Sequence, residues 1–386
     1  MSIVEIFHNL SAQPAVPADV LGPETRDPWR AHRSLPGYAP TELRDCPRLA
    51  SLLGVGTVLV KDESVRLGLP SFKILGASWA SLTAIQRAWC PPSDEPVTLQ
   101  SVAAGLDRTQ DRGLIAATDG NHGRGVARIA SMLGLSATIL VPAGTAQARI
   151  DAIESESALV DVVDGTYDDA IAASAQLADA DHLVISDTSW EGYEEVPRAV
   201  IDGYSTMFHE IDDALASRDL PRPDVVSLQA GVGAFAAAAL RHYRTGKAGE
   251  PKTAVVEPAG ANCLQASARS GAMTLVPGPH TSSMAGLNCG LPSQLAWPVV
   301  AAGCDAFIAI SDDYTERAMR ALADSGIVAG ESGAAGLAGL LALVEGADSA
   351  ALARVGLHPR ACVLVVNTEG ATDPVNYRRV LAQPAD

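Results

Sequence analysis

Lys73 is the first residue whose type and setting could do chemistry. It lies in the stretch RLGLPSFKILGAS that begins at Arg66, between Phe72 and Ile74. Apolar neighbours partly desolvate an amine and lower its pKa, which leaves a lysine able to form a Schiff base. An exposed lysine in the first turn of a helix fits the same local sequence. Both interpretations therefore stay open on local sequence alone.

A glycine turn in the segment VVSLQAGVGAFAAAAL, residues 225–240, is the second candidate. An apolar strand leads into Gly231, Val232 and Gly233, and an alanine-rich helix follows from Ala234. Backbone N–H groups at such a helix N-terminus can converge on a phosphate group. The turn is neither a dinucleotide-binding fingerprint nor a Walker loop, and an ordinary tight turn is the alternative.

Polar residues at three further strand ends complete the set. In ATDGNHGRGVAR, residues 117–128, Asp119 could move a proton and Asn121 could hydrogen-bond a cofactor hydroxyl, whereas His122 fits a capping or packing role. Asp187 follows an apolar run in ISDTSWEGYEEVP, with aromatic residues nearby, and Thr368 lies in VVNTEGATDP. Each of these has an alternative role in a loop or a cap. Together with the lysine, they predict an enclosed cofactor that carries a phosphate.

The elements that must position these residues are short apolar strands alternating with helices. Strands are expected over 57–61, 114–117, 137–141, 159–163, 182–185, 225–228, 253–257, 306–310 and 362–366. Helices are expected over 72–88, 126–133, 146–153, 168–177, 196–216, 235–243, 312–322 and 334–344. A glycine loop is expected over 119–125, an irregular arm over the proline-rich residues 11–45, and a polar connection over 91–111.

This alternation predicts an α/β fold with mostly parallel, twisted sheets flanked by helices. Ligands of such sheets bind at the C-terminal ends of the strands, which is where the candidate residues concentrate.

Composition excludes several classes of function. The chain has 386 residues and 28 Lys+Arg against 45 Asp+Glu, a formal net charge of −17. That balance argues against a nucleic-acid partner, and no apolar run is long enough for a membrane span. Without a visible signal peptide and with six scattered cysteines, a cytoplasmic protein with reduced thiols is expected. Pairing of Cys263 with Cys289 is left open, and no metal site is expected because no second histidine stands at ligand spacing.

The order SFK, then DGNHG, then the Gly-Val-Gly turn resembles pyridoxal-phosphate enzymes of fold type II, the tryptophan synthase β/threonine dehydratase group. The stretches LGLPSFKILGAS, DGNHGRG, DTSWEGYEEVP, MAGLNCGLPS, GESGAAGL and NTEGATDP narrow the resemblance to the diaminopropionate ammonia-lyase family, over about Arg66 to Tyr377. One departure is Leu291, where members usually have an acidic residue after Asn-Cys-Gly.

The resemblance implies a role for each candidate. Lys73 becomes the Schiff-base lysine, and Asp119 and Asp187 become two bases. The expected cofactor-binding residues are Lys73, Phe72, Asn121, Gly231, Val232, Gly233, Ala234 and Thr368, with Thr368 as the partner of the pyridine nitrogen. The expected cofactor is pyridoxal 5′-phosphate.

The resemblance also implies a reaction and an architecture. The expected reaction is the elimination of D- and L-2,3-diaminopropionate to pyruvate and ammonia. A serine/threonine dehydratase, a β-replacement enzyme, a lyase for a modified diamino acid and a non-catalytic binding protein are the alternatives. A large cofactor-binding domain, residues 1–80 and 188–386, and a smaller α/β domain, residues 81–187, would enclose the active site. A homodimer with a small amino-acid substrate is expected.

Overall fold

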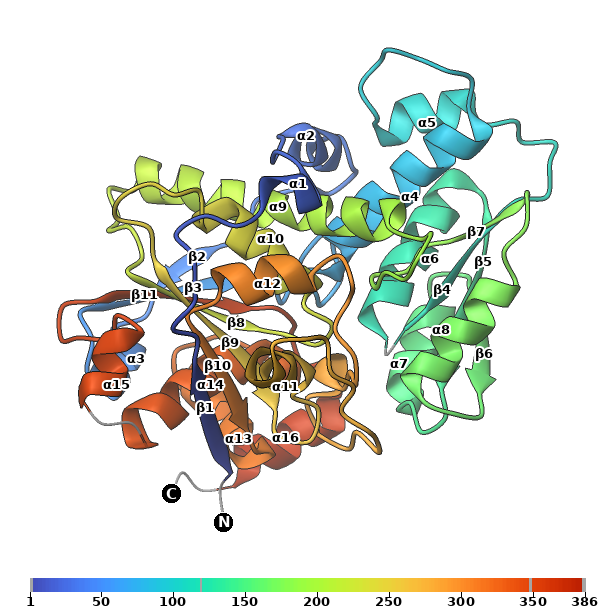
Figure 1. Ribbon diagram of the computed structural model, residues 1–386. Helices are drawn as coiled ribbons and strands as arrows, with labels where there is room; N and C mark the ends of the chain where they lie inside the picture. Colours follow the sequence, from blue (N-terminus) through green and yellow to red (C-terminus); the bar gives the residue numbers. More distant parts are fainter. Residues whose placement is uncertain (1–2, 119, 347–348, 384–386) are drawn as a thin grey trace. The chain divides into compact units, whose positions relative to one another are not determined.

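The computed structural model describes residues 3–118, 120–346 and 349–383 of the chain (Figure 1). The chain divides into two compact units. The first unit comprises Met1–Pro23, Pro40–Val65 and Glu210–Asp386, and the second comprises Glu24–Ala39 and Arg66–His209. Helix α9 (Glu195–Ser217) contributes residues to both.

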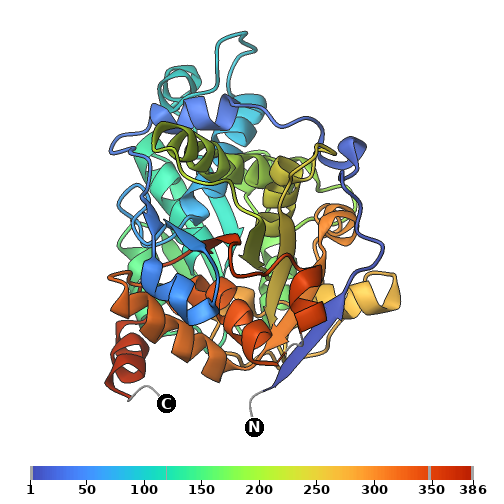
Figure 2. The same ribbon diagram turned by 90° about the vertical axis from the view of Figure 1, so that its left-hand side faces the viewer.

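The first unit contains a seven-stranded sheet in the order β1-β10-β9-β8-β11-β3-β2. Its strands are β1 (Val4–His8), β2 (Leu43–Asp45), β3 (Thr57–Asp62), β8 (Val225–Gln229), β9 (Lys252–Pro258), β10 (Ala306–Ile310) and β11 (Cys362–Asn367). The five central strands are parallel, and the edge strands β1 and β2 run antiparallel to their neighbours. Figures 1 and 2 show β1, in dark blue, at one edge. Every residue of β8, β10 and β11 is buried, as expected for strands covered on both faces.

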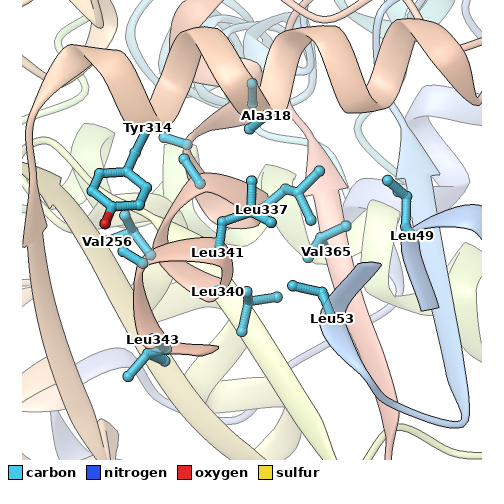
Figure 3. Packing of buried hydrophobic residues seen from close by; sticks show 14 of the residues in the cluster. Leu49, Leu53, Val256, Tyr314, Ala318, Leu337, Leu340, Leu341, Leu343 and Val365 are labelled. Carbon is cyan, nitrogen blue, oxygen red and sulfur yellow. The ribbon is translucent and has the colours of Figure 1, made fainter. Parts of the chain in front are cut away.

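Several helices of the first unit pack on this sheet. The unit contains α1 (Ala18–Leu21), α3 (Pro47–Leu53), α10 (Ala234–Tyr243), α11 (Cys263–Ser270), α12 (Trp297–Gly303), α13 (Asp312–Asp324), α14 (Glu331–Gly346), α15 (Ser349–Arg354) and α16 (Pro374–Ala382), with the 3₁₀ turn η1 (Ala285–Leu287). Of these, α3, α10, α11 and α14 pack on the strands of the sheet. Helix α14 is buried along most of its length and places Leu337, Leu340 and Leu341 in one cluster with Val256 and Val365 of the sheet (Figure 3). This apolar cluster packs α14 against β8, which leads into the turn at Gly231–Gly233, and against β11, which leads to Thr368.

The second unit contains a four-stranded parallel sheet in the order β6-β5-β4-β7. Its strands are β4 (Gly113–Ala117), β5 (Ser136–Pro142), β6 (Leu159–Val163) and β7 (His182–Val184). Its helices are α2 (Asp27–Arg33), α4 (Lys73–Trp89), α5 (Leu99–Gly105), α6 (Asn121–Leu133), α7 (Gln147–Glu154) and α8 (Tyr167–Gln176).

Two glycines let helices α4 and α9 approach closely. A Cβ on Gly203 would lie 2.3 Å from the carbonyl oxygen of Leu75, and one on Gly76 would lie 2.6 Å from the ring of Tyr204. Neither position has room for a side chain without a shift of its neighbour. The close crossing sets where α4, and hence Lys73 at its first turn, lies within the second unit.

The expected α/β fold with mostly parallel, helix-flanked sheets is confirmed. The compact units begin and end at other residues than the expected domains, 1–80 with 188–386 and 81–187. The difference arises because three segments belong to the second unit: residues 24–39, residues 66–80 with the start of α4, and residues 188–209 with most of α9. The assignment of one domain to cofactor binding stays a prediction.

Some local predictions were wrong. The arm over 11–45 contains α2, because a proline at the second position of a helix leaves the helix hydrogen bonds intact. The connection over 91–111 contains α5, which begins with a capping box at Thr98. Helix α6 begins at Asn121, not Val126, and its Gly123 serves packing, since a Cβ there would lie 2.5 Å from Ile139 and Thr118.

Among the residues that the structure describes, no helix combines the length and apolar composition that a membrane crossing requires.

Candidate active site

Lys73 is the first residue of α4, and its amine forms an ion pair. The Nζ atom lies 2.6 Å from Oδ2 of Asp187, which follows β7. The lysine side chain is 20% exposed and the aspartate side chain 6% exposed, so the pair is largely shielded from water. The structure thus places the predicted lysine against one of the two predicted bases, rather than on the surface.

Asp187 is held in its ionised form. Burial by itself would raise the pKa of this carboxyl group, but the positive charge of Lys73 and the nearby His122 oppose it. Tyr167 at the start of α8 donates a hydrogen bond of 2.9 Å to Oδ1. Together these partners hold the pKa of Asp187 well below its ordinary value. The carboxylate therefore stays charged, and it would become a stronger base if the amine of Lys73 lost its positive charge.

The segment after β7 is braced by two aromatic residues. Trp190 and Tyr193 stack with ring centroids 4.2 Å apart. The hydroxyl of Tyr193 donates to the carbonyl oxygen of Val184 at 2.6 Å and accepts from the amide of Ser186 at 3.1 Å. Burial raises the pKa of Tyr193, so this phenol stays protonated. These contacts hold the backbone on both sides of Asp187, which fixes where its carboxylate points.

Residues near Lys73 and Asp187 come from the same unit. Phe72 is buried and packs on Tyr204 of α9, with ring centroids 4.7 Å apart, and its own ring lies 5.8 Å from Nζ of Lys73. Asn121 is the first residue of α6. His122 is almost fully buried, and its Nε2 lies 2.8 Å from the carbonyl oxygen of Ile185. Asp119 lies outside the described residues.

The glycine turn lies in the first unit, between β8 and α10. Gly233 has φ +96°, a left-handed conformation that suits glycine, and it is the N-cap residue of α10, where it provides no side-chain hydrogen bond. A Cβ on Gly231 would lie 2.8 Å from Sγ of Cys289. The carbonyl oxygen of Val232 accepts from the amide of Ser293 at 2.9 Å. A helix N-terminus that follows such a turn is the kind of place where backbone N–H groups bind a phosphate group.

Thr368 lies at the end of the neighbouring strand. β11 pairs in parallel with β8, Val365 opposite Ser227, so Thr368 and the glycine turn follow two adjacent strand ends of one sheet. Thr368 is 3% exposed, and its Oγ1 accepts a hydrogen bond of 2.7 Å from Nε2 of Gln229. The structure therefore brings Thr368 and Gly231–Ala234 to one sheet edge in the first unit. Lys73, Phe72, Asn121 and Asp187 lie in the second unit.

Sequence reasoning missed Tyr167 and Gln229, and it assigned His122 a capping or packing role. The missed signal for Tyr167 is its place after β6, at the same C-terminal strand edge as Asp187. No signal marked Gln229, because one glutamine inside an apolar strand has no chemical meaning until its partners are known. No disulfide joins any of the six cysteines, Cys263 and Cys289 included.

The fold and these residues define a pyridoxal-phosphate dependent enzyme, and the model of that family matches residues 35–357. Diaminopropionate ammonia-lyase of Salmonella typhimurium is 36% identical to this chain over 91% of the chain and 90% of the relative. The Escherichia coli enzyme of the same name is 37% identical over 91% of the chain and 89% of the relative. The chain belongs to the diaminopropionate ammonia-lyase family.

Solved structures agree with this assignment. The crystal structure of the Escherichia coli diaminopropionate ammonia-lyase in complex with D-serine matches with a TM-score of 0.89 and 32% identity, covering 98% of this chain and 97% of that chain. The structure of the same enzyme with an aminoacrylate–pyridoxal-phosphate azomethine reaction intermediate matches with a TM-score of 0.85, also at 32% identity, covering 99% and 97%.

Proposed function

We propose that this protein catalyses the pyridoxal-phosphate dependent α,β-elimination of D- and L-2,3-diaminopropionate. The products are pyruvate and two molecules of ammonia, with one water consumed. The observation that carries this proposal is the shielded pair of Lys73 and Asp187, which places an amine beside an ionised carboxylate. The relatives from Salmonella typhimurium and Escherichia coli carry the name of this activity.

The residues present fit the cofactor. Helix α10 begins after Gly233, which provides no side-chain cap, and a helix N-terminus of this kind suits a phosphate group. Thr368 offers a buried hydroxyl for the ring nitrogen, Asn121 a carboxamide for the ring hydroxyl, and Phe72 an apolar surface. Lys73 would attach the cofactor covalently through Nζ. When bound, pyridoxal phosphate acts as an electron sink that makes the α-proton of an amino acid acidic.

The two aspartates divide the work of proton removal. Asp187, ionised and buried, accepts the α-proton of the L substrate, and Asp119 accepts that of the D substrate. Lys73, protonated in its pair with Asp187, supplies the proton that the departing β-amino group needs to leave as ammonia. Because the two bases act on different enantiomers, loss of one leaves the other reaction intact.

A substrate panel with two matched variants tests this function. We expect the wild-type protein to release pyruvate from D- and L-2,3-diaminopropionate much faster than from D- or L-serine. Asp187→Asn should lose about 10²–10⁴-fold on the L substrate with a small effect on the D substrate, and Asp119→Asn should show the reverse. Equal losses on both enantiomers in both variants would refute the two-base division.

The dehydratase alternative predicts a different outcome of the same panel. The threonine dehydratase of Corynebacterium glutamicum is 31% identical over 60% of this chain, a shorter match than those to the ammonia-lyases. If serine or threonine were turned over faster than either form of diaminopropionate, the chain would be a dehydratase, and the proposed substrate would be wrong.

We also propose that the protein is a cytoplasmic homodimer. Six cysteines that no disulfide joins agree with a reducing compartment. The dimer is the usual assembly of fold type II enzymes. Light scattering on the purified holoenzyme measures the assembly directly, and a monomeric mass at micromolar concentration would exclude the dimer.

A further inference from the structure

Gln229, the last residue of β8, has a carboxamide group with an unusual set of partners. It is 2% exposed, and four oxygen atoms lie within hydrogen-bond distance of its Nε2. Three are backbone carbonyl oxygens, of Ser332 at 3.1 Å, Gly333 at 3.2 Å and Val366 at 2.9 Å. The fourth and nearest is Oγ1 of Thr368, at 2.7 Å.

The three carbonyl oxygens determine which end of the carboxamide faces Thr368. Carbonyl oxygens only accept hydrogen bonds, so the group that faces them must be the NH₂ end, which only donates. The Oε1 end lies toward α14, where a Cβ on Gly336 would be 3.0 Å away, and it has no hydrogen-bond partner among the described residues. Rotating the amide by half a turn would place Oε1 against the three carbonyl oxygens, a costly arrangement for buried groups.

This orientation determines the role of the Thr368 hydroxyl. The hydroxyl has one proton to donate and can accept hydrogen bonds through its lone pairs. Toward Gln229 it accepts, because the amide nitrogen cannot accept. In the part of the chain that the structure describes, no acceptor for the proton of Thr368 is found. That proton is therefore left for a bound molecule.

We propose that Gln229 is a positioning residue that directs the proton of Thr368 to the ring nitrogen of the cofactor. The inference rests on the role proposed above for Thr368. A ring nitrogen that accepts this proton is itself unprotonated. If it were protonated, it would donate to the second lone pair of the Thr368 hydroxyl, and the hydroxyl proton would then have no acceptor. Gln229 thus determines the protonation state of the ring nitrogen through Thr368, without contacting the ring itself.

The test uses variants of Gln229 and a matched control on the same strand. Gln229→Met keeps the length and shape of the side chain and removes its donors. Ser227→Ala is the control, because Oγ of Ser227 donates to the carbonyl oxygen of Gly336 at 2.8 Å. It removes a buried hydrogen bond between β8 and α14 without touching Thr368. Thr368→Val removes the hydroxyl itself.

The readout is the NMR chemical shift of an isotopically labelled ring nitrogen in the holoenzyme, without substrate. We expect an unprotonated nitrogen in the wild type. Gln229→Met and Thr368→Val should shift its resonance in the same direction, and Ser227→Ala should leave it unchanged. Gln229→Met in the Thr368→Val background should add no further shift. The cofactor dissociation constant should rise roughly threefold to tenfold in Gln229→Met, the loss of one orienting hydrogen bond.

Several results would overturn the proposal. If the ring-nitrogen resonance of Gln229→Met has the wild-type position, Gln229 has only a structural role. The same conclusion follows if Gln229→Met and Ser227→Ala move the resonance equally. An unchanged resonance in Thr368→Val would show that Thr368 does not bind the ring nitrogen, and Gln229 could then not act through it. If the methionine variant does not fold, Gln229→Asn retains a carboxamide that is one carbon shorter, and the same shift is expected. Because no substrate is present, failure here is distinct from failure to turn over diaminopropionate.

Discussion

Removing Lys73 should destabilise the cofactor-free protein in a way that depends on pH. The lysine amine lies 2.6 Å from a carboxylate that is 6% exposed. In Lys73→Ala, Asp187 keeps the hydrogen bond from Tyr167 and the neighbouring His122, but it loses the ion pair. The buried carboxylate must then remain charged without its main partner, or take up a proton.

The distance and the burial give the size of the effect. Two unit charges 2.6 Å apart attract by about 6 kcal/mol at an effective dielectric constant of about 20, which is an upper bound. The lysine is 20% exposed and two other groups still face the carboxylate, which reduces this value. Breaking a buried pair by removing one partner typically costs about 3–5 kcal/mol, and we expect about 3 kcal/mol here near pH 7.

The sign of the pH dependence follows from the pKa of Asp187. In the wild type this pKa is lowered in the folded state, so the pair stabilises the fold above the unfolded pKa of about 3.9 and this contribution is lost as the pH falls below that value. In Lys73→Ala, burial still raises the pKa and only His122 and Tyr167 oppose it, so we expect the pKa of Asp187 to rise. The variant is then least stable at high pH and regains stability on acidification. The difference between variant and wild type should shrink from about pH 8 to about pH 5.

Urea unfolding of cofactor-free protein at both pH values measures this difference. Lys252→Ala is the matched control, because its Nζ lies 2.8 Å from Asp305 but the lysine is 49% exposed. Asp305 also keeps Arg244 at 3.4 Å, so we expect a loss of about 0–1 kcal/mol there at either pH. Lys73→Ala combined with Asp187→Asn should recover part of the lost stability. A pH-independent loss in Lys73→Ala, or a loss equal to that of the control, would refute the reasoning.

Three further predictions concern the hydrogen bond from Tyr167 to Asp187, the glycine turn and the apolar core. Tyr167→Phe removes a hydrogen bond that lowers the pKa of Asp187, so the acidic limb of the pH–rate profile for L-diaminopropionate should move to higher pH, with the D profile unchanged. Gly233→Ala forces a side chain into φ +96° and should cost about 1–2 kcal/mol in urea unfolding and weaken cofactor binding in a titration. Leu341→Ala, at a residue 2% exposed, should cost about 2–5 kcal/mol and lower the melting temperature. Leu381→Ala, 39% exposed, is its control and should change stability by less than about 0.5 kcal/mol.

Much of the fold could be predicted because periodicity and strand ends are local properties. The runs 306–310 and 159–163 are strands at those residues, and the glycine turn after 225–228 does lead into a helix. The start of α6 could not be predicted, since Gly123 and Gly125 looked like loop residues. Their helical role depends on Thr118, Ile139 and Ala77, which crowd the space that a Cβ would take.

The sequence by itself determined the residue types of the candidate site and their positions after apolar runs. That information is local, and it was sufficient to propose Lys73, Asp187, the glycine turn and Thr368 as candidates. Only the tertiary structure decided that the amine of Lys73 pairs with Asp187, 114 residues away, and that Gln229 donates to Thr368, 139 residues away. The physical reason is that a charge or a hydroxyl acquires its protonation state from the groups that surround it. Those groups come together only when parallel strands bring distant segments to one edge of a sheet.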